Sequence, residues 1–314
     1  MKKLLMAVIA ASTLWSADAA EAKKAEAATA TNEVIELEEE DDDLPFAFWG
    51  FGNYGMYSGY QLYGSLLNSE PTMSGYVEGN VSILPNDIDL GYLGIGIWSN
   101  SDLTDKRRDL YGKAFNEWDF NIHWGRVFWF DDEKQWGLDY RTEVVWYYYP
   151  HGRGHDYNSH GKSHFQYGRN TMTTMDWNHA FELKNPYVIP YFKWVHEYHE
   201  NKANLWLGGF KKTIEVCNSL TMTPIFEMVY RSSRYNWCFP TAGWTELHGS
   251  GMASTKLGVD FNYAITKNFG LFAKVYWCHL VDHSLRAAAD HGNGGDYGQY
   301  KDFAWGGFGA TFNF

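Results

Sequence analysis

The sequence predicts an all-β protein: a transmembrane, antiparallel, up-and-down β-barrel of about twelve strands, with ten or fourteen as alternatives. Three observations lead to this prediction. Aromatic residues make up 18% of the 314 residues, although the mean hydropathy is only −0.43. Many segments alternate apolar and polar residues with period two, which marks a strand with two different faces. The connections between these segments alternate between short and long, as a membrane barrel requires.

The aromatic content is easier to place in a barrel than in a soluble domain. The chain holds 15 Trp, 22 Tyr and 20 Phe, more large rings than a soluble core of this length readily buries. A barrel gathers such rings at the two membrane interfaces and turns its polar residues toward the lumen. The net charge of −12 argues against nucleic acid as a partner.

The first residues have the pattern of a cleavable signal peptide, assigned to 1–19. A basic start at Lys2 and Lys3 precedes an apolar run over 4–14, and Ala17-Asp18-Ala19 matches a cleavage site. The apolar run is shorter than the roughly 20 residues of a spanning helix. We therefore expect an exported chain whose mature part begins near Ala20.

Residues 20–44 form a separate acidic segment, in which ten acidic residues stand against two lysines. Like charges in one block repel each other and bury nothing, so we expect a disordered periplasmic segment. Two interpretations of this segment stay open: a solubilising leader, or a docking site for a basic periplasmic partner. The barrel is then assigned to residues 45–314.

Alternation along the remaining chain gives twelve candidate strands. They are residues 47–58, 74–84, 90–99, 117–130, 136–149, 171–184, 186–199, 203–216, 220–232, 252–264, 269–281 and 301–314. The connections at 85–89, 131–135, 185, 217–219 and 265–268 are short, and those between them are long except at 200–202. This order predicts an even barrel with both termini in the periplasm, and external loops that include 59–73.

The last strand is the clearest one. Phe308, Phe312 and Phe314 fall on one face, while Thr311 and Asn313 fall on the other. A terminal Phe after alternating apolar residues resembles the C-terminal assembly signal of Gram-negative outer-membrane barrels. The resemblance implies location in the outer membrane, recognition by the barrel-assembly machinery, and contact with outer-membrane lipid and lipopolysaccharide.

The polar face of the strands supplies the candidate residues of the lumen. Mixed charge inside a barrel either creates a field that filters solutes or forms a salt-bridged plug. The candidates for selectivity are Asp139, Arg141, Glu143, Glu227, Arg231, Lys256, Asp260 and Lys274. Arg126 is the exception to the pattern, because it falls on the lipid face; we expect it either to reach the periplasmic headgroups or to mark a bulge.

Family resemblance beyond the barrel class is limited. The length and strand number resemble the nucleoside-specific channel family, which implies solute passage. The stretch Gly94-Ile95-Gly96-Ile97-Trp98-Ser99-Asn100 and the strand end Trp146-Tyr147-Tyr148-Tyr149-Pro150 are similar to small uncharacterised outer-membrane families. The sequence thus favours a porin or channel for small polar solutes. The alternative is a non-conducting structural or adhesive barrel whose surface loops bind ligands.

Enzymatic function is the weakest alternative. His248-Gly249-Ser250 has the spacing of a barrel phospholipase pair, but a serine nucleophile needs a base and a group that orients it. No such partner is evident, so we expect no catalytic residues, no cofactor and no hydrolase.

Two further groups of residues are candidates for other chemistry. His151, His155, His160 and His164 lie in one predicted loop and could bind a transition metal, although their spacing matches no defined site. His196 and His199 point to opposite faces of a strand, which disfavours chelation. Of three cysteines, only Cys238 and Cys278 are predicted to lie near the same end of the barrel and could pair.

Overall fold

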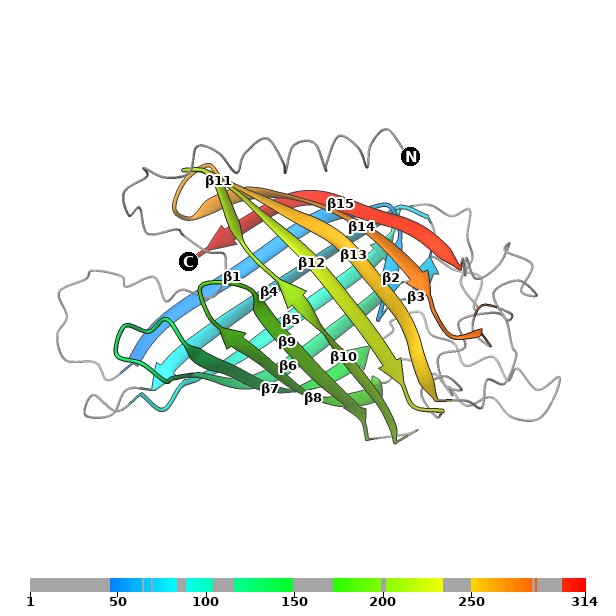
Figure 1. Ribbon diagram of the computed structural model, residues 1–314, viewed down its shortest axis with the longest axis horizontal. Coiled ribbons are helices and arrows are strands. Elements are labelled where there is room, and N and C mark those ends of the chain that lie inside the picture. Colours follow the sequence, from blue (N-terminus) through cyan, green and yellow to red (C-terminus); the bar gives the residue numbers. More distant parts are fainter. Residues whose placement is uncertain are drawn as a thin grey trace. The chain divides into compact units, whose positions relative to one another are not determined.

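The computed structural model describes residues 46–63, 65–68, 70–83, 89–103, 116–148, 172–198, 202–233, 250–283, 286 and 301–314. All of them belong to one unit, residues 34–314, and nearly all lie in strands (Figure 1). Within this part of the chain, no helix has the length and apolarity to cross a membrane. The predicted signal peptide and acidic segment lie outside the described residues.

The fold is a closed antiparallel barrel with twelve strand positions around the ring. Strands β10 and β11 together occupy one of these positions, and β2 and β3 form a separate hairpin. The strands are β1 (Phe46–Tyr57), β2 (Tyr60–Leu62), β3 (Ser65–Asn68), β4 (Thr72–Ile83), β5 (Tyr92–Asp102), β6 (Asn116–Trp129), β7 (Gly137–Tyr148), β8 (Met172–Lys184), β9 (Ile189–Glu197), β10 (Ala203–Lys211), β11 (Ile214–Cys217), β12 (Leu220–Arg231), β13 (Gly251–Ala264), β14 (Phe269–Leu280) and β15 (Asp302–Asn313).

The last strand meets the first, as the sequence predicts. Strand β15 pairs with β1 from Gly307↔Tyr57 to Asn313↔Phe51. Beyond this ladder, the Gly50 amide donates to the Phe314 carbonyl at 2.7 Å, and the Phe314 amide donates back at 3.1 Å. The pairing of β10 with β12 completes the ring. Every strand of the ring thus has a neighbour on both sides except the short β11, which pairs with β12 alone. Backbone groups in lipid require such pairing.

All twelve predicted strands are confirmed to within a few residues, with one interruption. The eighth strand is interrupted at Lys212 and Thr213, between β10 and β11. The Lys212 amide donates to the Pro224 carbonyl of β12 at 3.3 Å, but proline has no N–H with which to return the bond. The ladder is therefore interrupted opposite Pro224.

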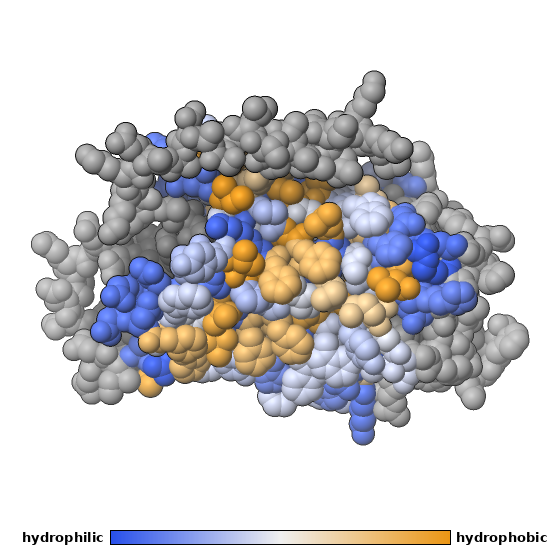
Figure 2. All heavy atoms as spheres, viewed as in Figure 1, coloured by the Kyte–Doolittle hydropathy of each residue, from blue (hydrophilic) through white to orange (hydrophobic). Residues whose placement is uncertain are grey.

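The outer face of the barrel is apolar. Ile95, Leu257 and Val275 are 66%, 56% and 59% exposed, values that a soluble protein rarely gives to several large side chains on one face. Figure 2 shows apolar residues gathered across the middle of the visible face, with hydrophilic residues toward both ends. This distribution is the band that hydrocarbon requires.

The two ends of the barrel differ in their connections. At the end that we call the turn end, short connections join the strands, and Phe314 lies there as well. At this end the Asn185 side chain accepts from the amides of Tyr187 and Val188, both at 3.0 Å, and Asp131 accepts from the Trp136 amide at 2.9 Å. The opposite end, which we call the loop end, carries the longer connections.

Arg126 lies on the outer face, and no bulge accompanies it, since β6 pairs with β7 in continuous register. Its Nε atom is 3.8 Å from Oδ2 of Asp89, in the connection at the turn end. Its guanidinium lies over the Phe128 ring, 4.9 Å from the centroid. Reach toward the turn end, the first of the two expectations, is what the structure shows, whereas the predicted bulge is wrong.

The prediction for residues 59–73 needs correction. These residues are not simply an external loop, because Tyr60–Leu62 and Ser65–Asn68 pair as a β-hairpin. The Gly59 carbonyl accepts a hydrogen bond at 2.7 Å from Nε1 of Trp305, a side chain on the lumen face of β15. The hairpin is therefore held to the inner wall of the barrel.

Candidate functional site: the lumen

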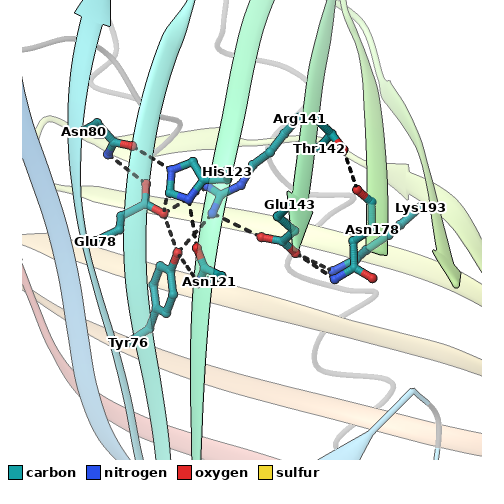
Figure 3. Close-up of polar contacts among 10 residues, drawn as sticks. All are labelled: Tyr76, Glu78, Asn80, Asn121, His123, Arg141, Thr142, Glu143, Asn178 and Lys193. Carbon is teal, nitrogen blue, oxygen red and sulfur yellow. Dashed lines mark hydrogen bonds and ion pairs between the residues drawn. The ribbon is translucent and has the colours of Figure 1, made fainter. Parts of the chain in front are cut away.

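The centre of the lumen holds a cluster of ionic and polar side chains from five strands, β4 and β6 to β9 (Figure 3). Arg141 of β7 lies between two carboxylates: its Nη1 is 3.0 Å from Oε2 of Glu78, and its Nη2 is 3.3 Å from Oε2 of Glu143. Glu143 also accepts from Lys193 of β9 at 3.1 Å. The cluster alternates acid and base, so each charge has an opposite charge beside it.

Neutral groups extend this cluster across β5. The Tyr76 hydroxyl donates to Glu78 at 2.5 Å and accepts from Arg141 at 3.0 Å. Nε2 of His123 is 2.7 Å from the Asn80 side-chain oxygen. These contacts join β4 to β6, although β5 lies between them.

Glycines on β5 make this contact possible. A Cβ at Gly94 would be 2.2 Å from the Asn80 side chain and 2.3 Å from His123, and one at Gly96 would be 2.5 Å from the Tyr76 hydroxyl. Only a residue without a side chain leaves room for groups of β4 and β6 to meet over β5.

Further ion pairs line the wall toward the turn end and on the facing strands. Lys184 is 3.0 Å from Asp139, and Lys211 is 2.5 Å from Glu182. On the facing strands, Lys256 is 2.8 Å from Glu227, and Lys274 is 3.9 Å from Asp260. The Tyr276 hydroxyl donates to Asp260, and that of Tyr191 donates to Glu227 at 3.0 Å.

Many of these interior charges are accessible to solvent. The side chains of Lys274, Lys193 and Lys211 keep 33%, 25% and 24% of their surface exposed. A small barrel that is filled by its own side chains would bury such groups. Water therefore reaches the charged wall from the middle of the barrel to the turn end.

The loop-end half of the interior is filled instead. Val195, Leu205, Val229 and Leu280 are at most 1% exposed and form one apolar cluster with Ala203, Leu207 and Ala253. Their strands place them on the lumen face, opposite the lipid-facing side chains. An apolar cluster facing the inside of a membrane barrel needs a cover, and Tyr63 of the hairpin connection packs against it.

The hairpin is fixed to several strands at once. The Tyr63 carbonyl accepts from Nη2 of Arg231 on β12 at 2.7 Å. The Tyr60 ring packs 5.6 Å from the Trp98 ring of β5, and the Thr72 hydroxyl donates to the Gly59 carbonyl at 3.3 Å. These partners lie on different sides of the barrel, so the hairpin crosses the interior at the loop end.

Tyr63 is the strained point of the hairpin. Its φ is 46°, in the left-handed region that bulky residues rarely adopt. Burial raises the pKa of its phenol well above the usual value, and the negative charge of Asp176 raises it further. The phenol therefore remains protonated. A strained residue persists when its surroundings hold it, and here Arg231 binds its carbonyl.

The eight predicted lumen residues divide into two groups. Seven of them lie in the ion pairs of the lumen wall: Asp139, Arg141, Glu143, Glu227, Lys256, Asp260 and Lys274. Arg231 differs, because it is 1% exposed and binds the hairpin, so it is not a side chain of an open wall. Whether the seven filter solutes stays a prediction.

Sequence reasoning missed the partners of these charges. Glu78, Tyr76 and His123 were not selected, although polar residues recur at every second position of β4 from Ser74 to Ser82. That alternation was the available signal, and the intervening glycines and tyrosine obscured it. Lys193 was also missed: the strand at 186–199 was predicted, but Pro190 and the aromatic residues of β9 obscured which of its faces is polar.

Several other predictions concern residues that the structure does not describe. His151, His155, His160 and His164 lie outside the described residues, as do His248, Gly249 and Cys238. Cys278 is described and is buried. Across the described ranges, no three His, Cys, Asp or Glu side chains are arranged to hold a metal. The proposed histidine site and the Cys238–Cys278 pair stay predictions.

Comparison with known proteins gives similarity of fold. No family model and no curated protein matches the chain. The chain is similar to solved outer-membrane barrels. They include the KdgM porin (7% identity, TM-score 0.42, covering 84% of this chain and 99% of that one) and an outer-membrane channel from Pseudomonas putida F1 (10%, 0.47, 89% and 100%). Outer-membrane phospholipase A from Escherichia coli is another (9%, 0.41, 84% and 95%). At such identities the likeness concerns the barrel fold alone.

Proposed function

We propose that this protein is an outer-membrane channel for the passive diffusion of small polar solutes. One observation carries the proposal: the charged wall of the lumen is partly exposed, with side-chain exposures reaching 33% at Lys274. Because acids and bases alternate along this wall, it offers hydrogen bonds and local fields to polar solutes of either charge. The hairpin β2–β3 narrows the path at the loop end.

In this proposal, the barrel lies in the outer membrane with its loop end outside. Phe308, Phe312 and Phe314 of the last strand would present the assembly signal to the barrel-assembly machinery. Phe308 and Phe314 are 63% and 56% exposed on the outer face, where a receptor or lipid can reach them. Lipid and lipopolysaccharide would then cover the apolar band.

Conductance in planar bilayers tests the proposal directly. The purified full-length protein is expected to give stable, ion-permeable steps. Arg141→Gln is expected to shift permeability toward cations, because it removes a positive charge and leaves Glu78 and Glu143 in the wall. Lys267→Gln, the same charge change at an exposed turn, is the matched control and should leave selectivity unchanged. Absence of conductance at all voltages would overturn the proposal.

A second candidate is a closed structural or adhesive barrel. The observation that favours it is the filled loop-end half, where Leu205 and Arg231 are at most 1% exposed. Solute uptake into liposomes separates the two functions. A channel makes liposomes permeable to small sugars, whereas a closed barrel leaves them impermeable until the hairpin is removed.

A further inference from the structure

One sector of the outer face differs from the rest of the lipid-facing surface. We call it the polar aromatic patch and define it by seven residues of β7 to β10: Tyr140, Thr142, Trp177, His179, Trp194, His196 and Asn204. On β5, β6, β13 and β14, many outward positions are instead aliphatic, such as Ile95, Ile122, Leu257 and Val275, and no row of stacked imidazole and indole rings of this length is found on the described part of these four strands.

The rings of this patch form a continuous row. His179 stacks on Trp194, with centroids 5.2 Å apart and planes at 13°, and it packs 4.7 Å from Trp177. Trp194 continues to His196 at 5.9 Å. Thr142 and His179 are register partners near the middle of β7 and β8, so this row reaches the central part of the apolar band.

The hydrogen bonds of the patch fix the tautomer of His196. The Asn204 side-chain oxygen accepts from Nε1 of Trp194 at 2.9 Å and is 2.9 Å from Nδ1 of His196. Nδ1 of His196 must therefore carry a proton, which leaves Nε2 as an acceptor. The Tyr140 hydroxyl lies 2.8 Å from Nδ1 of His179. Either atom can donate there, so Nε2 of His179 is a donor in one tautomer and an acceptor in the other.

The outward nitrogens lack partners within the barrel. No described residue forms a hydrogen bond with Nε2 of His179, with Nε2 of His196, or with the Asn204 side-chain N–H groups. Acyl chains contain no donor or acceptor, so lipid alone does not satisfy Nε2 of His179, which lies near the middle of β8. His196 and Asn204 lie near the loop ends of β9 and β10 and extend the same polar surface.

We infer that the polar aromatic patch is the contact surface for a second copy of this chain in the membrane. The patch carries a donor at Asn204 and an acceptor at His196, and Nε2 of His179 can serve as either, so two copies can satisfy each other. A two-fold contact places the same surface on both subunits and requires such self-complementarity. Strand β9 ends at Glu197 and β10 begins at Ala203, so few residues join the two strands that carry Trp194, His196 and Asn204.

The mass of the full-length protein in lipid nanodiscs or mild detergent tests this inference. Wild type is expected to form a concentration-dependent dimer. His179→Leu with His196→Leu is expected to raise the dimer dissociation constant by about tenfold or more, because the two changes remove the hydrogen bonds that these imidazoles form across the contact. Heat-modifiable migration in gels verifies that the variant is a folded barrel.

His279→Leu is the matched control, since His279 stacks on Trp277 of β14 in a similar way, at 5.5 Å and 21°, but lies outside the patch. It is expected to leave the dissociation constant unchanged. A monomeric wild type at every concentration would overturn the inference, as would equal dimer affinity in the patch variant. So would a different protein bound at the patch in place of a second copy. Mass is measured without solute flow, so this result is independent of the proposed channel function.

Discussion

In the loop-end half of the lumen, Leu205 and Arg231 are 0% and 1% exposed, whereas Lys274 at mid-barrel and Lys211 at the turn end keep 33% and 24% of their side-chain surface accessible. The same strands form the wall of both halves. The difference comes from one inserted element, the β2–β3 hairpin, together with the apolar cluster that it covers. A barrel wall therefore does not by itself decide whether its interior is open; the material inside it does.

The two halves also handle charge differently. From the centre to the turn end, acids and bases alternate, and in the Glu78–Arg141–Glu143–Lys193 series both carboxylates have a cation beside them. In the loop-end half, Arg231 binds a backbone carbonyl of the hairpin. In the first half, charge maintains a polar wall, and in the second it anchors a plug.

Removing the hairpin is expected to have the largest effect on this contrast. Replacing residues 60–68 by a short Gly/Ser linker takes away the element that crosses the loop end, so single-channel conductance in planar bilayers should rise several-fold. Heat-modifiable gel migration checks that the barrel still folds. Unchanged conductance in a folded barrel would show that solutes do not pass the hairpin.

Loosening the hairpin without removing it should have a smaller effect. Arg231→Met removes the hydrogen bond to the Tyr63 carbonyl and a buried cation, and is expected to lower the free energy of unfolding by about 3 kcal/mol. Urea unfolding in lipid vesicles measures the change, and conductance should become noisier as the hairpin moves. Lys267→Met, at an exposed turn, is the control. A stable, quiet Arg231→Met channel would contradict the anchoring role.

Adding a side chain at a glycine beside the charged wall should lower the stability somewhat less than Arg231→Met does. Gly96→Val adds a side chain whose Cβ alone would lie 2.5 Å from the Tyr76 hydroxyl and 2.7 Å from the Asn121 side chain. The expected loss of stability is about 2 kcal/mol. Gly79→Val is the matched control, because nothing lies within 4 Å of its Cβ position. Equal stability of the two variants would show that the contacts across β5 are dispensable.

The smallest expected effect comes from one accessible charge. Lys274→Gln breaks a 3.9 Å pair with Asp260 in a solvent-accessible part of the wall, so stability should fall by less than about 1 kcal/mol. Reversal potentials in a salt gradient should nevertheless move toward cation preference, since Asp260 loses its neighbouring cation. A selectivity equal to that of wild type would place Lys274 away from the conducting path.

The positions of the strands and the faces of their side chains could be predicted from the sequence because both depend on local alternation. A one-residue slip would move a whole row of side chains between lipid and lumen, so the apolar rows of Leu257, Val275 and Phe308 determine the register. The aromatic last strand and the short turns also predicted closure, and closure follows since a free edge is costly in lipid.

The contents of the lumen could not be predicted in the same way. Glu78 and Arg141 meet although 63 residues separate them, and Gly59 contacts Trp305 across 246 residues. Such contacts depend on strand tilt, stagger and register around the whole ring, which no local pattern records. The sequence by itself determined that this chain is a barrel and which residues face inward. Only the tertiary structure decided that a hairpin fills one half and paired charges line the other, because both outcomes depend on which distant side chains closure brings together.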